Sequence, residues 1–455
     1  MTEQKVMNRW FVVAGALIIQ ISLGAVYIWS VFQSPLRAAF PSWTETQVTM
    51  PAQIVLASFA LAVIFGGRIQ DKLGPRRVAT TGGVILGAGL LLASMTSRFA
   101  GGSALAWLIG TYAVLGGVGI GMAYVCPIAT CVKWFPDKRG LISGLAVAGF
   151  GAGAFFFAPL ARGLISGTPY SLFGVKLFPL PELGVFPTFL VLGVIFLVAV
   201  VVGAQLLINP PAGYVPAGWA PPMPTPGAAV QKVDYGPREM LRTPRFWLLW
   251  LTYFAGCTAG LMVIMKASPI WQSFRIGVMT PPIGATDYDQ IATAGAMAVA
   301  ILAIFNSVGR IFWGKVSDSI GRQTTLMAMF IICGIAMLGL DWMRVYPLYL
   351  IGICVIALCF GGFLALYPAV TADFFGTMNI GVNYGWMFTA YGAGGLAGPY
   401  LAARLMTVAA ETPYEVADGA YKTFEVGHYR PAFLLAGVAC LLAAGLARGL
   451  KKPGV

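Results

Sequence analysis

The most constraining feature of the sequence is a series of apolar segments, each about 20 residues long and almost free of charge. A helix rises 1.5 Å per residue and needs about 20 residues to cross the hydrocarbon layer of a bilayer. Only 10% of the 455 residues are charged, too few for the surface of a water-soluble chain of this length. We therefore expect an all-α polytopic membrane protein with transmembrane helices at 10–33, 48–68, 78–97, 104–132, 141–165, 184–208, 245–270, 290–314, 323–341, 346–370, 380–405 and 430–448.

The basic residues follow membrane topology. The formal net charge is +13, but Lys and Arg fall between the apolar segments and form no single basic face, which argues against nucleic acid as a partner. With both termini in the cytoplasm, eighteen of the 29 Lys and Arg lie inside and nine outside, while Lys266 and Arg310 lie within spans. This bias satisfies the positive-inside rule. We expect a multi-pass protein of the plasma or inner membrane, with lipid around it and both termini cytoplasmic.

Two loops at corresponding places reveal an internal repeat. The loop after the second span reads Gly67-Arg68-Ile69-Gln70-Asp71-Lys72-Leu73-Gly74-Pro75-Arg76-Arg77, and the loop after the eighth reads Gly314-Lys315-Val316-Ser317-Asp318-Ser319-Ile320-Gly321-Arg322. Both follow the pattern G-x-x-x-D-x-x-G with trailing cations. Spans five and eleven also correspond, since Gly144, Gly151 and Gly153 align with Gly385, Gly392 and Gly394.

The repeat predicts two six-helix halves. We expect the halves at 1–208 and 245–455, joined by a cytoplasmic linker at 209–244 that is rich in Pro and Gly. Halves repeated in this way place a solute site near the membrane midplane, between them. The outer loops 166–183 and 406–429 are long for simple turns, so we expect partial order there.

The first of these loops carries a family resemblance. Gly67 to Arg77 matches the G-x-x-x-D-[RK]-x-G-x-[RK]-[RK] signature of the major facilitator superfamily, which implies that superfamily's fold. The resemblance implies a conformational gate in which Asp71 contacts the start of span eleven, near residues 379–381. A carboxylate is favoured at the positive end of a helix. The gating residues expected from both copies of the loop are Gly67, Asp71, Arg76, Arg77, Asp318 and Arg322; a role in topology alone is the alternative.

A narrower resemblance covers most of the chain. The stretches from Trp134 to Gly140, Glu239 to Trp247 and Phe312 to Asp318, with Asn383-Tyr384-Gly385, resemble the oxalate/formate antiporter family. That family is similar to the monocarboxylate transporters. The resemblance implies a small carboxylate as solute.

Arg310 is the cation best placed to bind a carboxylate. A charged side chain deep in a span costs about 2.5–3.5 kcal/mol on insertion, so it is a functional candidate. Its guanidinium can make two parallel hydrogen bonds to a carboxylate, and Asn306, one turn earlier, can orient it. The resemblance also places a substrate-binding arginine here. The alternative is that Arg310 extends toward water at the membrane surface.

Two further positions bear on specificity. Lys266 lies near the outer end of span seven, where it can bind the solute or draw anions toward the entrance. Oxalate-transporting relatives carry a lysine in span eleven at the place held here by Tyr391. One fixed cation suits a monocarboxylate such as lactate or formate, whereas a dianion would need two.

Four aromatic residues are expected to line the cavity. Tyrosine hydroxyls can donate to a carboxylate, and aromatic rings can form walls for its apolar part. The alternative for each residue is ordinary packing. The candidates are Tyr27, Trp29, Tyr124 and Tyr367.

The sequence argues against an enzyme. The single histidine, His428, lies in an outer loop, and the spans contain no paired acids or metal-ligand cluster, so no cofactor or metal is expected. All 16 acidic residues lie in loops or at span ends, and Asn306 stands where the monocarboxylate transporters carry an aspartate. Proton symport and anion exchange both remain open. The alternatives to monocarboxylate transport are an oxalate-type dicarboxylate exchanger and a transporter of neutral solutes or drugs.

Overall fold

The computed structural model describes residues 7–172, 175–216, 218–219, 234–415 and 421–450. Part of the predicted linker, residues 217 and 220–233, lies outside the described residues. The chain forms two compact units, which are considered separately: the first comprises Met1–Met240 and Pro368–Thr389, and the second comprises Leu241–Tyr367 and Ala390–Lys452. The segment Pro368–Thr389 thus lies within the predicted second half, 245–455, and belongs by its contacts to the first unit.

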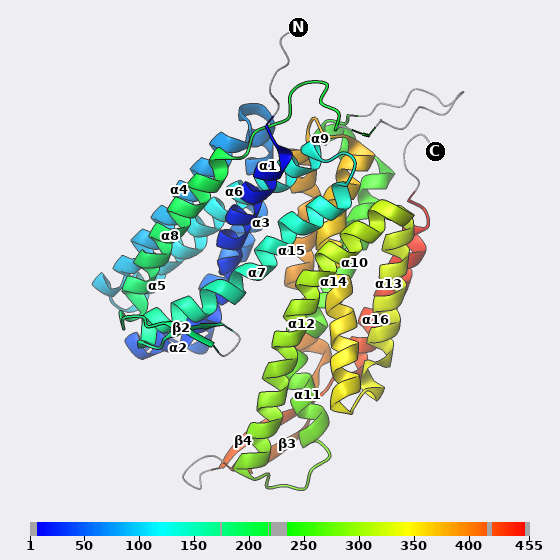
Figure 1. Ribbon diagram of the computed structural model, residues 1–455. Helices are drawn as coiled ribbons and strands as arrows, with labels where there is room; N and C mark the ends of the chain where they lie inside the picture. Colours follow the sequence, from blue (N-terminus) through cyan, green and yellow to red (C-terminus); the bar gives the residue numbers. More distant parts are fainter. Residues whose placement is uncertain (1–6, 173–174, 217, 220–233, 416–420, 451–455) are drawn as a thin grey trace. The chain divides into compact units, whose positions relative to one another are not determined.

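Elements α1 to α9 follow one another before the second repeat begins (Figure 1). They are α1 (Arg9–Leu23), a 3-10 turn (Gly24–Ile28), α2 (Trp29–Ala39), α3 (Glu45–Leu73), α4 (Pro75–Ala93), a 3-10 turn (Ser94–Arg98), α5 (Gly101–Leu108), a π-helical turn (Ile109–Leu115), α6 (Gly116–Trp134), α7 (Arg139–Ser166), β1 (Tyr170–Leu172), β2 (Val175–Phe178), α8 (Val185–Gln205) and α9 (Pro237–Leu241).

The elements of the predicted second half run from α10 to α16. Its elements are α10 (Pro244–Ile264), α11 (Ala267–Ile276), α12 (Ala285–Ile320), α13 (Arg322–Gly339), a 3-10 turn (Leu340–Trp342), α14 (Tyr346–Phe375), α15 (Ile380–Leu405), β3 (Thr407–Glu415), β4 (Tyr421–His428) and α16 (Arg430–Ala447).

The expected spans correspond to helices of the structure. Within the described residues, eleven helical stretches are long and apolar enough to cross a membrane, from Arg9–Ala39 to Arg430–Ala447. The remaining span, expected at 380–405, coincides with the 26-residue helix α15. At 1.5 Å per residue this helix is also long enough to cross the hydrocarbon layer. Most of the observed helices extend a few residues beyond the predicted ends.

Glycines determine how closely the helices of the first unit approach. A Cβ atom on Gly119 of α6 would lie 2.4 Å from the backbone nitrogen of Leu86 and 2.7 Å from the carbonyl oxygen of Gly82, both in α4. A Cβ atom on Gly24 would lie 2.0 Å from the carbonyl oxygen of Phe150 in α7. Small residues allow this backbone contact, which replaces the hydrophobic driving force that is lost between helices in lipid.

Both long loops contain a β-hairpin. Strands β1 and β2 pair antiparallel in the loop 166–183, and β3 and β4 pair antiparallel in the loop 406–429. In the second unit, Ile276, Ile283 and Val426 form a small buried cluster beneath the β3–β4 hairpin. The expectation of partial order therefore holds for the described parts of these loops; residues 173–174 and 416–420 lie outside them.

The glycine contact predicts that Gly119→Leu destabilises the first unit. The added side chain has no space between α4 and α6, and overpacking of this kind costs about 1–3 kcal/mol. We expect a lower apparent melting temperature of the detergent-solubilised protein, measured by thermal unfolding. Gly110→Leu in the same span is the matched control, because a Cβ atom there meets nothing within 4 Å. Equal melting temperatures for the two variants would contradict the packing argument.

Candidate functional site

Arg310 is buried in the second unit. It lies on α12 ten residues before the helix ends at Ile320, about 15 Å along the axis, and its exposed fraction is 2%. An arginine that extends toward the membrane surface keeps its guanidinium in water, and this burial does not fit that alternative. The backbone of α12 is held close to α14, since a Cβ atom on Gly309 would lie 2.1 Å from the carbonyl oxygen of Leu358.

Asn306 lies one helical turn before Arg310, at the same helix crossing. A Cβ atom on Gly361 of α14 would lie 2.0 Å from the carbonyl oxygen of Asn306. The side-chain Oδ1 of Asn306 is buried and has no hydrogen-bond partner among the described residues. A buried amide oxygen without a partner costs free energy unless a water molecule or a ligand donates to it. The pair thus offers a buried guanidinium and an acceptor on neighbouring turns.

Lys266 lies outside the helix in which it was expected. The predicted span 245–270 divides into α10, which ends at Ile264, and α11, which begins at Ala267. Lys266 is the residue before α11, and its side chain is exposed. The helix break leaves Lys266 in a short turn.

The two tyrosines predicted for the second unit differ in environment. Tyr367 of α14 is fully buried, stacks on Tyr253 with ring centroids 4.0 Å apart, and donates a 2.8 Å hydrogen bond to Oγ1 of Thr252. Its hydroxyl proton is therefore already used within the protein. Tyr391 of α15 is half-buried.

The predicted aromatic residues of the first unit also differ. Trp29 is buried, and its Nε1 donates a 2.9 Å hydrogen bond to the carbonyl oxygen of Val48, which is a packing role inside the helix bundle. Tyr124 is buried in an aromatic cluster whose other members are Phe59, Phe150 and Phe388. Tyr27 is 41% exposed and places its ring edge-on to Phe150.

Gln20 is a buried polar residue that the sequence argument missed. It lies in α1, is fully buried, and donates from Nε2 to the carbonyl oxygen of Tyr124 at 3.1 Å. Its Oε1 has no hydrogen-bond partner among the described residues. The available signal is a lone amide side chain within an apolar span. Gln20 links α1 to the helix that carries the Tyr124 cluster.

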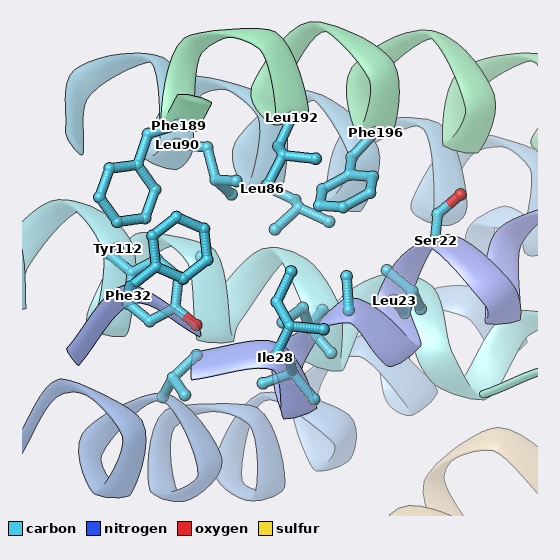
Figure 2. A pocket seen from close by; sticks show the side chains of 15 residues that line it. Ser22, Leu23, Ile28, Phe32, Leu86, Leu90, Tyr112, Phe189, Leu192 and Phe196 are labelled. Atoms are coloured by element: carbon cyan, nitrogen blue, oxygen red, sulfur yellow. The ribbon is translucent and has the colours of Figure 1, made fainter. Parts of the chain in front are cut away.

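A cavity in the first unit does not suit an anion. It is lined by residues of α1, α2, α3, α4, α6 and α8 and of the turns Gly24–Ile28 and Ile109–Leu115, and nearly all are apolar (Figure 2). Tyr112 and Ser22 supply hydroxyl groups, and no charged residue lines it. The described residues also contain no cluster of three or more His, Cys, Asp or Glu that could hold a metal ion.

Asp71 binds the start of α15. Its Oδ1 accepts a 3.1 Å hydrogen bond from the backbone nitrogen of Gly381, and its Oδ2 accepts a 2.8 Å bond from that of Val382. Nε2 of Gln70 donates to the same carboxylate at 2.6 Å. Gly67 permits the approach, because a Cβ atom there would lie 2.1 Å from the carbonyl oxygen of Gly381. The contact caps otherwise unsatisfied amides at the positive end of a helix.

A second contact fastens the end of α14 within the same unit. Arg139, at the start of α7, forms a 2.6 Å ion pair with Asp373 of α14. Two residues earlier, Asp137 accepts two hydrogen bonds from the guanidinium of Arg9, at 2.7 and 3.2 Å. The stretch Trp134 to Gly140 thus supplies ionic partners to Asp373 of α14 and to Arg9 of α1.

The remaining predicted gating residues have other partners. Arg76 donates to the carbonyl oxygen of Gln205 at 2.6 Å, and Arg77 is exposed. In the second unit, Asp318 forms a 2.7 Å ion pair with Arg322, four residues away. Asp71 therefore binds the start of α15, and Asp318 forms an ion pair within its own copy of the repeated loop.

Comparisons with known proteins give a family for the chain and several named relatives. The family profile described as Major Facilitator Superfamily matches residues 7–399 and, in an overlapping match, 270–454. The Oxalate:formate antiporter of Oxalobacter formigenes is 29% identical over 416 residues, which are 88% of this chain and 85% of the relative. Apicoplast pyruvate carrier 1 of Toxoplasma gondii is 29% identical over 398 residues, 77% of this chain and 68% of the relative. Monocarboxylate transporter 13 of Rattus norvegicus is 32% identical over 152 residues, 33% of this chain and 34% of the relative.

A solved structure confirms the fold. FucP, described as a transporter of the same superfamily in the outward conformation, superposes with a TM-score of 0.62 at 15% identity and covers 97% of this chain and 98% of its own. The predicted fold of twelve transmembrane helices and both predicted resemblances are therefore confirmed. The chain is a multi-pass membrane protein.

The Asp71 contact predicts that Asp71→Asn loosens the start of α15. An asparagine keeps one acceptor oxygen, so one of the two backbone hydrogen bonds and the charge are lost. If the contact holds the side that carries the termini closed, a cysteine at Tyr391→Cys should react several-fold faster with a membrane-impermeant maleimide added from that side. Lys72→Gln, an exposed neighbour, is the control. Equal labelling rates for Asp71→Asn and the parent would remove Asp71 from the gate.

Proposed function

Since the chain belongs to the Major Facilitator Superfamily and is therefore a transporter rather than an enzyme, we propose that it carries small organic anions, chiefly monocarboxylates. Transport proceeds by alternating access, in which the two repeats expose a midplane site to each side in turn. The observation that carries this proposal is the burial of Arg310 at 2% exposure. An anion that accepts two hydrogen bonds from a guanidinium removed from water stabilises its buried charge.

Relatives support a carboxylate as the solute. The names of three of them, an oxalate:formate antiporter, a pyruvate carrier and a monocarboxylate transporter, all specify carboxylates. The chain covers most of the first two of these relatives. The proposal is that Arg310 binds the carboxylate and Tyr391 supports the apolar part of the solute. Asn306, whose Oδ1 accepts no hydrogen bond from the described residues, is proposed to orient the guanidinium once the solute is bound. Tyr27, Tyr124, Tyr367 and Lys266 complete the proposed set of contacts, directly or through the groups that they position.

The orientation and location complete the proposal. An even number of spans puts both termini on one side of the membrane. The excess of Lys and Arg on that side supports its assignment to the cytoplasm of a cell-membrane protein. The gate formed by Gly67 and Asp71 against α15 is then cytoplasmic.

Exchange of one carboxylate for another accounts more simply than proton symport for an asparagine, and not a carboxylate, beside Arg310. A buried carboxylate able to carry a proton is expected in a symporter, and Asn306 occupies the place next to Arg310 where such a group would stand. Exchange needs no proton carrier in the protein. If protons accompany transport, the solute carboxylate or Lys266 would carry them.

A dicarboxylate exchanger is the second candidate, favoured by the oxalate:formate relative. Counterflow in proteoliposomes distinguishes the candidates, with labelled formate or lactate outside and a panel of mono- and dicarboxylates inside. Acceleration by monocarboxylates is the expected result. Acceleration by oxalate alone would favour the second candidate, and no acceleration by any carboxylate would overturn both.

Removal of the guanidinium should abolish saturable transport. We predict that Arg310→Ala and Arg310→Lys both lose at least about 100-fold in carboxylate counterflow. The alanine variant has no cation for the carboxylate, and the lysine variant replaces a two-point ion pair with a single-point contact. Reconstituted protein must elute as a monodisperse species to show that it is folded. Lys315→Ala, on an exposed part of the same helix, is the control. Uptake by Arg310→Ala at the parental rate would refute the role of Arg310.

A lysine at position 391 should change the preference between anions. With one fixed cation, a dianion leaves one charge unpaired in a low-dielectric cavity, a penalty of several kcal/mol. We predict that Tyr391→Lys increases competition by oxalate and decreases competition by lactate in the counterflow assay. Tyr391→Phe, which keeps the ring, is the control. A parent protein that already prefers oxalate would show that the charge count is wrong and that Lys266 supplies the second cation.

A further inference from the structure

The predicted linker, residues 209–244, is called the connector, and the described residues near both of its ends are held by contacts with the first unit. At its first end, Trp134 of α6 donates from Nε1 to the carbonyl oxygen of Ile208 and places its ring edge-on to Tyr214, with centroids 4.8 Å apart. At its second end, Asp234 and Tyr235 lie against the turn between α14 and α15. We call residues Asp234–Gly236 the strap.

The strap makes four hydrogen bonds to this turn and to the adjoining ends of α14 and α15. Oδ1 of Asp234 accepts from the backbone nitrogen of Met378 at 2.9 Å. The backbone nitrogen of Tyr235 donates to the carbonyl oxygen of Phe375 at 2.9 Å. The carbonyl oxygen of Tyr235 accepts from Nδ2 of Asn379 at 3.2 Å and from Nδ2 of Asn383 at 3.0 Å. Both backbone groups of Tyr235 are therefore satisfied by the turn, as they would be in a paired strand.

The turn that holds the strap also presents the amides that Asp71 binds. Asn379 and Asn383 flank Gly381 and Val382, whose backbone nitrogens donate to the Asp71 carboxylate. Asn383 is fully buried, which indicates that its contact with the strap is a fixed part of the fold. A carboxylate cap depends on the direction of the amide N–H groups. Fixing the residues on either side of Gly381 and Val382 fixes that direction.

Electrostatics on this face support the same arrangement. Lys133, near the end of α6, lies within electrostatic range of both Asp71 and Asp234. The strap thus adds a second carboxylate to the surroundings of this lysine. A connector that served only as a tether would have no need for these contacts, because a flexible chain joins two bodies without being fixed to either.

We propose that the strap is part of the gate: by binding the α14–α15 turn, it holds the start of α15 in the geometry that Asp71 caps. This role is independent of the identity of the solute. It also assigns a role to Asn383, whose side chain serves as a ligand for the connector backbone. Loss of the strap should loosen the α15 start even when Asp71 is present.

Amide hydrogen exchange of peptides covering residues 376–384, followed by mass spectrometry, tests this proposal without a substrate. Tyr235→Pro removes the donor to Phe375, and Asp234→Ala removes the acceptor for Met378. In each variant we expect exchange of these amides to accelerate by about tenfold, the factor that corresponds to a hydrogen bond of roughly 1.4 kcal/mol. Unchanged exchange in Tyr235→Pro overturns the proposal. If that variant does not fold, Asp234→Ala decides by the same criterion.

Matched controls separate the strap from other effects. Tyr235→Phe keeps the ring and both backbone groups and should exchange like the parent. Asp234→Asn keeps an acceptor for Met378 but removes the charge near Lys133, so it measures the electrostatic contribution alone. Cleavage at a protease site inserted between residues 220 and 233 should leave the exchange unchanged. Acceleration after cleavage would show that tension from the connector, and not the strap contacts, orders the turn, and would overturn the proposal.

Discussion

The absence of water from the bilayer interior is the constraint on which the rest of this structure depends. Each backbone polar group there must be satisfied within its own helix, so helices are the only elements that can cross. The helices then attract one another through close packing rather than through a hydrophobic effect. Backbone contacts at Gly24, Gly67 and Gly309 are the result, each too close to admit a Cβ atom. Those contacts determine which side chains face protein and which face lipid.

The burial of Arg310 follows from one of these contacts. Gly309 and Gly361 bring α12 and α14 together on either side of the turn that carries Asn306 and Arg310. Had the helices been separated by ordinary side chains, the guanidinium would have had a path toward water. The first unit uses the same device for another purpose, since Gly67 lets α3 approach α15 closely enough for Asp71 to reach two backbone amides. Close approach thus places both the proposed binding cation and the proposed gate.

The sequence predicted the helices well because a span is defined by a local property, the length of an apolar run. It also indicated where Asp71 would bind, through the family resemblance. It failed where partners are distant and uncharged. The amides of Gln20 and Asn383 satisfy carbonyl groups 104 and 148 residues away, and no local pattern distinguishes such amides from ordinary polar residues. It also placed Lys266 in a helix, because hydropathy alone does not show that α10 ends at Ile264.

The contacts of Asp71, Arg139 and the strap have a thermodynamic consequence for a transporter. Asp71, Arg139 and the strap make their contacts at the ends of helices, where breaking a neutral hydrogen bond costs about 0.5–1.5 kcal/mol net and breaking one to a charged group costs about 1.5–3 kcal/mol. A few such contacts therefore set a difference of a few kcal/mol between the two states. A solute that binds one state better by that amount is sufficient to shift the equilibrium. The proposed gate contacts belong at the membrane surface for this reason, whereas the proposed binding cation belongs where water cannot compete with the solute.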